Sequence, residues 1–212
     1  MKHILAEGDD TTPDSEAFAL RRNQTLELLD KLQSAAGWKP GWRREELSKL
    51  LATRSGNEDG FYDLLDGMVT DGLLVRRGSA FSTATYRPAL PDHLEAAARQ
   101  LEENLLADGV APRDWELALS QVCADPKGFA ILSEHLLGLG RLEKLTDKLV
   151  FSPAALAQAR EVLRQRSAGA PFTTSQAKEW LDISRKFIIA LLEWMDSVEW
   201  TCREGDERIL KG

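Results

Sequence analysis

The stretch PFTTSQAKEWLDISRKFIIALLEWMDSVEWTCREGDERIL, residues 171–210, decides the fold that we expect for this chain. Thr173 or Thr174 can cap a short helix that ends at Leu181, because a threonine oxygen accepts a hydrogen bond from the free N–H groups of a first helical turn. A second helix is expected from Ser184, since apolar residues then recur at helical spacing, namely Phe187, Ile188, Leu191, Leu192 and Met195.

The end of this stretch predicts a β-hairpin. Residues 199–203 and 207–210 have the composition of two strands, and Glu204-Gly205-Asp206 is typical of the turn between them. Two helices followed by a hairpin predict a winged helix.

Two cations open the second helix of this module. In a helix-turn-helix, the first residues of the second helix face nucleic acid, so Arg185 and Lys186 are candidates for phosphate contacts. Cations at a helix N-terminus are mildly unfavourable, which favours a function over a merely solvated first turn. Ser184 is expected to act as the N-cap and as a possible phosphate donor.

Two arginines, Arg203 and Arg208, lie on the facing strands of the hairpin. They are candidates for clamping an RNA backbone or for stacking on an unpaired base. The alternative is a cross-strand ion pair with a neighbouring glutamate. Gly205 and Asp206 form the turn between the arginines, and Asp206 is also a candidate for holding an arginine in place.

The same order of elements occurs three times. Beyond the stretch above, we expect helices over 16–36, 43–52, 59–70, 91–107, 112–122, 126–139 and 153–166, and hairpins with turns near 77–79 and 146–148. The expected fold class is mainly α with short β-hairpins, arranged as a tandem array of three winged-helix modules. The expected segments are a disordered leader over 1–14 and modules over 15–90, 91–151 and 152–212.

Composition excludes several classes of protein. The chain has 212 residues, a formal net charge of −7 and no apolar run of the roughly 20 residues that span a bilayer. The acidic balance disfavours a protein that coats nucleic acid indiscriminately. Cys123 and Cys202 are far apart, so two reduced thiols in a cytoplasmic protein are expected. The chain is also expected to be a monomer.

No motif indicates an enzyme or a bound cofactor. The chain has no phosphate-binding glycine loop, and its three histidines lack metal-ligand spacing. The six tryptophans, Trp38, Trp42, Trp115, Trp180, Trp194 and Trp200, are expected in cores or interfaces rather than as stacking platforms. Arg76 and Arg77, near the first hairpin, are candidates for RNA or ribosome contact, although a solvated wing is the simpler interpretation.

The last module resembles the final winged helix of the selenocysteine-specific elongation factor family, SelB. The family pattern SRK, LLE, D and T-x-R-x-GD-x-R is matched by Ser184, Arg185, Lys186, Leu192, Glu193, Asp196, Thr201, Arg203, Gly205, Asp206 and Arg208. The chain departs from it at Glu199, where the family usually has glycine, and at Cys202, where a basic residue is usual. The stretches GWRREELSKLL…FYDLLDGMVTDGLLVRRGSAF and DGVAPRDWELAL…LLGLGRLEKLTDKLVF are similar to the second and third winged helices of the family.

The resemblance implies a function in selenocysteine incorporation. It implies that the last module binds an mRNA hairpin, the selenocysteine insertion element (SECIS), and tethers a translation elongation factor with its selenocysteyl-tRNA beside the ribosome. GTP binding would belong to a part of the parent protein that precedes the winged helices. The alternatives are a protein-interaction scaffold without nucleic acid and, less favoured, a DNA-binding regulator.

Overall fold

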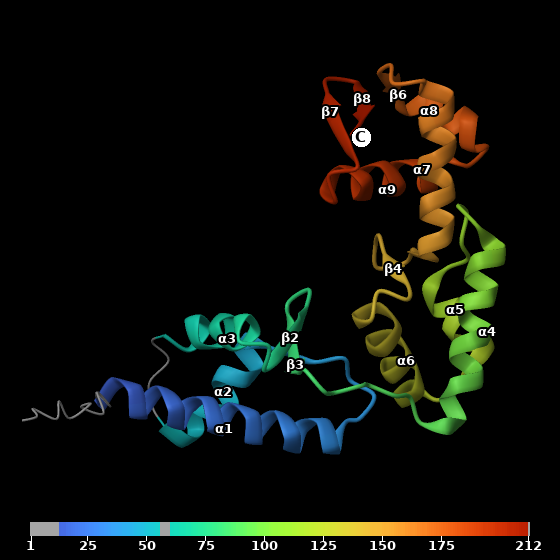
Figure 1. Ribbon diagram of the computed structural model, residues 1–212. Coiled ribbons are helices and arrows are strands. Elements are labelled where there is room, and N and C mark those ends of the chain that lie inside the picture. The colour runs from blue at the N-terminus through green and yellow to red at the C-terminus, as the bar shows by residue number, and fades with distance from the viewer. Residues whose placement is uncertain (1–12, 56–59, 212) are drawn as a thin grey trace, which may run out of the picture. The chain divides into compact units, whose positions relative to one another are not determined.

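The fold is that of a computed structural model, which describes residues 13–55 and 60–211 (Figure 1). The chain forms two compact units, one ending at Ala89 and the other starting at Leu90. Most of the expected leader, and part of the loop expected near residue 56, lie outside the described residues. No described helix is long and apolar enough to cross a membrane.

The first unit is one helical module with a small sheet. Its elements are α1 (Pro13–Ala35), β1 (Trp42–Arg43), α2 (Arg44–Ser55), α3 (Phe61–Thr70), β2 (Leu74–Arg77) and β3 (Ala80–Thr83). The strands are antiparallel in the order β1-β3-β2. A buried apolar cluster joins helices and sheet through Leu29, Trp42, Leu47, Leu64, Leu65, Met68, Leu74 and Phe81.

The second unit continues with two sets of helices and strands. The first set is α4 (Asp92–Asp108), α5 (Trp115–Val122), α6 (Pro126–Gly138), β4 (Glu143–Lys144) and β5 (Val150–Phe151). The last set is α7 (Pro153–Ser167), β6 (Phe172–Thr173), α8 (Thr174–Leu181), α9 (Arg185–Ser197), β7 (Thr201–Glu204) and β8 (Glu207–Leu210). The last three strands pair in the order β6-β8-β7, and the β7–β8 hairpin rises from the end of α9 (Figure 1).

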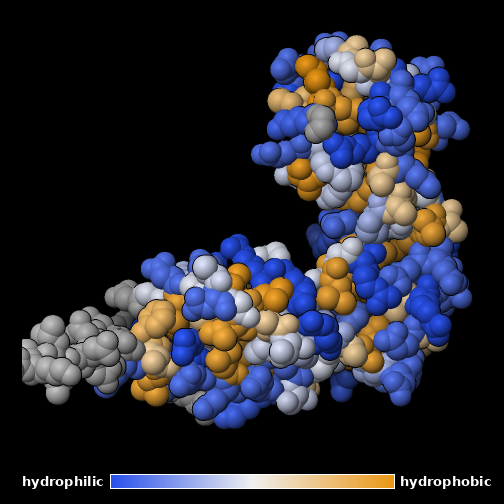
Figure 2. Space-filling view, viewed as in Figure 1, coloured by the Kyte–Doolittle hydropathy of each residue, from blue (hydrophilic) through white to orange (hydrophobic). Residues whose placement is uncertain are grey.

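The apolar core of the last set extends into the end of the first set. Leu149 and Phe151 at β5 belong to the same buried cluster as Leu156 and Leu163 of α7 and Leu191 of α9. Figure 2 shows hydrophilic residues over much of the visible surface, with hydrophobic residues in small groups between them. The last winged helix is therefore stabilised in part by residues that precede it.

The expected mainly α fold with short β-hairpins is confirmed, because the described chain is mainly helical with short antiparallel hairpins. The division into three winged-helix modules stays a prediction. Several features differ from the prediction, and α5 begins at Trp115 rather than at Pro112. The first helix begins at Pro13 rather than at Glu16, and the two-residue strands β1 and β6 were not predicted. A strand of two residues is too short to show the alternation by which strands are recognised in a sequence.

Candidate nucleic-acid interface

Local capping sets the angle between α8 and α9. Thr173 caps α8 in a reciprocal capping box with Gln176, as expected for one of the two threonines. At the other end, Asp182 adopts a left-handed conformation with φ of 50°, which stops α8 and redirects the chain. Ile183 is buried, and α9 then begins at Arg185.

The start of α9 presents three exposed polar side chains. Ser184 occupies the N-cap position as predicted, but its hydroxyl makes no capping hydrogen bond. Within the described part of the chain, Arg185 has no ion pair or hydrogen bond from its side chain, and Lys186 lies 5.2 Å from the ring centre of its neighbour Phe187. The first N–H groups of a helix lack intrahelical partners, so this end can bind an anion with backbone and side chains together.

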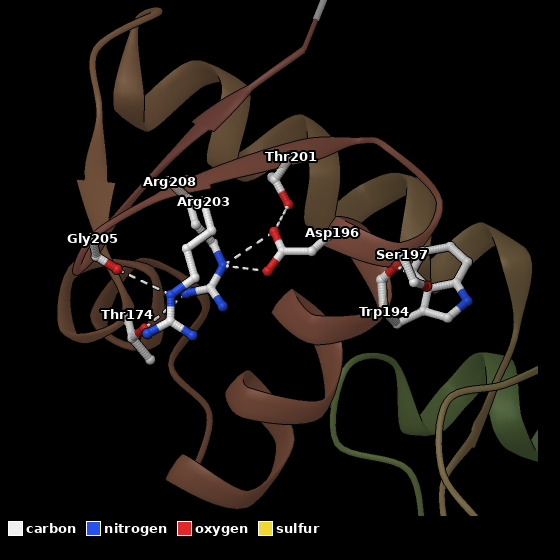
Figure 3. Close-up of polar contacts among 8 residues, drawn as sticks. All are labelled: Thr174, Trp194, Asp196, Ser197, Thr201, Arg203, Gly205 and Arg208. Carbon is white, nitrogen blue, oxygen red and sulfur yellow. Dashed lines mark hydrogen bonds and ion pairs between the residues drawn. The ribbon is translucent and has the colours of Figure 1, made fainter.

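At the tip of the hairpin, Arg203 is exposed. Its Nε–H donates to the backbone oxygen of Gly205 at 3.0 Å, and Gly205 has φ of 63°, as a tight turn requires (Figure 3). Asp206 is exposed at the same turn. The expected partnership of Asp206 with an arginine is not what the structure shows, because the carboxylate that binds Arg208 of the hairpin is Asp196.

Arg208 is buried, with only 5% of its surface exposed, which corrects the expectation of an exposed residue. Its Nε–H lies 3.0 and 3.2 Å from the two carboxylate oxygens of Asp196, and another guanidinium N–H donates to Oγ1 of Thr174 at 3.2 Å (Figure 3). The hydroxyl of Thr201 donates to the same carboxylate. Arg208 therefore links the hairpin to α8 and α9, and its first role is to position the hairpin.

In the first unit, apolar residues occupy the positions that Asp196, Thr201 and Arg208 occupy in the last module. In each β-hairpin, an arginine of the first strand is the direct cross-strand partner of a buried residue of the second strand. These pairs are Arg203 with Arg208 and Arg76 with Phe81. By the same alignment, Val69 and Leu74 stand where Asp196 and Thr201 stand in the last module. A buried ion pair replaced by apolar residues is often neutral or stabilising, so stability alone does not explain why the last module is polar here.

The structure places the candidate cations in two groups. Ser184, Arg185 and Lys186 lie at the start of α9, whereas Arg208 binds Asp196 near its end. Asp196 lies eleven positions after Arg185 on the helix, which is about 16 Å at 1.5 Å per residue. A ligand that contacts both groups must extend along α9.

Sequence reasoning did not identify Asp196, Thr174 and Thr201 as positioning residues. Asp196 can be identified by aligning the two β-hairpins, because the position of this carboxylate is taken by the apolar Val69 in the first unit. Across residues 13–55 and 60–211, no cluster of three His, Cys, Asp or Glu side chains could hold a metal ion.

Glu199, just before β7, has φ of 59°, a left-handed conformation that glycine adopts at less cost. The equivalent residue of the first unit is Gly72, with φ of 72°. We expect Glu199→Gly to raise the free energy of unfolding by about 1 kcal/mol, measured by chemical denaturation. The change also removes the exposed 3.7 Å pair with Lys211, which contributes little.

A matched control is Glu204→Gly, which removes the same side chain from β7, where glycine weakens a strand. This control should lower the stability. Equal effects of the two glycine substitutions would show that the conformation of Glu199 carries no strain.

Comparison with known proteins supports the resemblance seen in the sequence. Residues 165–210 match the family described as elongation factor SelB, winged helix, so the resemblance of the last module is confirmed. A search of curated proteins gives no match.

Two solved structures are similar to the chain. One is a bacterial selenocysteine-specific elongation factor, EF-Sec, with 23% identity and a TM-score of 0.49 over 92% of this chain and 30% of that one. The other is the mRNA-binding domain of E. coli elongation factor SelB in complex with SECIS RNA, with 15% identity and a TM-score of 0.48 over 58% of this chain and 100% of that one. The present chain thus spans less than a third of the length of the bacterial factor.

Proposed function

We propose that the last winged helix binds an RNA hairpin in an mRNA, and that by its resemblance to SelB this hairpin is a selenocysteine insertion element. The observation that carries the proposal is the pair of exposed cations at the start of α9, within a module whose residues 165–210 match the SelB winged-helix family. Selenocysteyl-tRNA, GTP and ribosome contacts would belong to the longer factor that such a module tethers.

The mechanism is binding without bond chemistry. Arg185 and Lys186 neutralise phosphates, aided by the Ser184 hydroxyl and the free N–H groups of the first turn of α9. Arg203, at the wing, contacts the backbone or stacks on an unpaired base. Arg208 keeps the wing in register by its bonds to Asp196 and Thr174.

The first test changes the start of α9. We expect Arg185→Ala and Lys186→Ala to weaken binding of a SECIS hairpin, and each to make the log–log salt dependence of the affinity shallower by roughly 0.7–0.9. The measurement is fluorescence titration of the full chain at several salt concentrations. The full chain is needed because Leu149 and Phe151 belong to the core of the last module.

Arg166→Ala is the matched control, because Arg166 is an exposed arginine of α7 in the same module. It should leave both the affinity and the salt slope unchanged. A scaffold without nucleic acid would show no salt-dependent affinity in any variant, and that result would defeat the proposal.

A further inference from the structure

We propose that the first unit carries a second RNA-binding surface, the first wing corner, formed by Arg44, Tyr62 and Arg76. It would bind unpaired nucleotides, with phosphates on the arginines and a base stacked on the tyrosine. This surface goes beyond the proposed function, which concerns the last module only.

Arg76 repeats the geometry of Arg203. Its Nε–H donates to the backbone oxygen of Gly78 at 2.8 Å, as Arg203 does to Gly205 at 3.0 Å, and its side chain is 51% exposed. The two wings therefore present an arginine in the same way, held by the carbonyl of a turn glycine with φ near 60°.

The first unit has Phe81 where the last module has Arg208, and Arg44 at the start of α2 supplies a positive charge beside it. Where the last module has Arg208 beside Thr174, the first unit has Phe81 beside Arg44, since Arg44 and Thr174 each begin the helix that follows a short strand. The guanidinium carbon atoms of Arg44 and Arg76 lie 5.6 and 5.9 Å from the ring centre of Phe81. Both corners thus carry two arginines on an otherwise different framework.

An exposed aromatic ring completes the first wing corner. Tyr62 is 44% exposed, and the guanidinium carbon of Arg44 lies 4.9 Å from its ring centre. Aromatic rings and arginine planes together bind bases of single-stranded RNA with little sequence preference. A tyrosine and two arginines at one corner fit such a ligand.

The charge of the corner is only partly neutralised. Among the described residues, the ion pairs of Arg44 and Arg76 run to one shared carboxylate, Asp66, at 3.6 and 3.9 Å. These distances are longer than direct hydrogen bonds, and Asp66 is itself half exposed. Arg44, Arg76 and Asp66 together carry a net charge of +1, in a chain whose net charge is −7, which favours an anionic ligand.

The test uses the full chain and a fluorescein-labelled, unstructured 12-nucleotide RNA at low salt. We expect Tyr62→Ala to weaken binding at least about fivefold, because stacking on one aromatic ring contributes about 1–3 kcal/mol. Arg76→Ala should weaken binding and make the salt dependence shallower by about 0.7. Arg87→Ala, which removes an exposed arginine elsewhere in the same unit, is the control and should change neither.

The outcome separates this surface from the last module. Binding of the SECIS hairpin should be unchanged in Tyr62→Ala and Arg76→Ala, whereas changes at Arg185 should affect the hairpin. Arg76→Lys keeps the charge and guards against a folding defect, so it should retain most of the affinity. Failure of the wild-type chain to bind the 12-nucleotide RNA, or an equal loss in Arg87→Ala, would overturn the proposal.

Discussion

Asp196→Ala should lower the free energy of unfolding of the second unit by about 3 kcal/mol. The substitution leaves the buried guanidinium of Arg208 without its carboxylate and Thr201 without its acceptor. Removing one partner of a buried ion pair typically costs about 3–5 kcal/mol, and the 25% exposure of the Asp196 side chain places the expectation at the lower end. Chemical denaturation followed by circular dichroism measures the effect.

Two variants control this experiment. Glu193→Ala removes an exposed carboxylate one turn earlier on α9 and should change the stability by no more than about 0.5 kcal/mol. The triple variant Asp196→Val, Thr201→Leu, Arg208→Phe installs the residues of the first unit and should recover most of the loss. Wild-type stability of Asp196→Ala would mean that Arg208 is satisfied without it.

Much of the fold follows from local signals in the sequence. Most helices and hairpins along the chain were predictable because apolar spacing, proline at helix starts and glycine at turns agree with each other. The strands β1 and β6 were not predicted, because they pair with the distant strands β3 and β8 and because a dipeptide such as Phe172-Thr173 shows no periodicity.

The candidate site was only partly predictable. The exposed positions of Ser184, Arg185, Lys186 and Arg203 agree with the general tendency of charged residues to lie at the surface. Arg208 violates this tendency because its partner, Asp196, lies twelve residues away on α9, and nothing local in the sequence reports that contact. The RNA-binding roles of these residues remain predictions.

A comparison within the chain gives information that composition does not. The two wings align residue by residue around Gly78 and Gly205, so each substitution between them shows which features packing requires and which it does not. Packing tolerates either Phe81 or Arg208 at the inner position, but an arginine at the tip, Arg76 or Arg203, is present in both. The tip arginine is therefore the feature of the wing that function explains better than stability does.

Arg203→Ala should weaken binding of the SECIS hairpin about fivefold or more while leaving the fold intact. An arginine that reads or stacks on a base contributes about 1–3 kcal/mol to specific binding, and one that contacts phosphate also contributes to the salt slope. Arg203 is exposed, and among residues 13–55 and 60–211 its side chain hydrogen-bonds to the turn carbonyl of Gly205 alone. Its removal should therefore change the unfolding free energy by no more than about 0.5 kcal/mol.

Its cross-strand neighbour Arg208 provides the contrast, because the two substitutions remove the same side chain from directly paired positions. Arg208→Ala should lower the free energy of unfolding by about 3 kcal/mol, because it removes the ion-pair partner of the Asp196 carboxylate near the end of α9. Its effect on the affinity for the SECIS hairpin should follow the loss of folded protein, and the salt dependence of that affinity should stay the same. A full-affinity Arg203→Ala variant would remove the wing from the RNA interface and leave the start of α9 as the proposed contact.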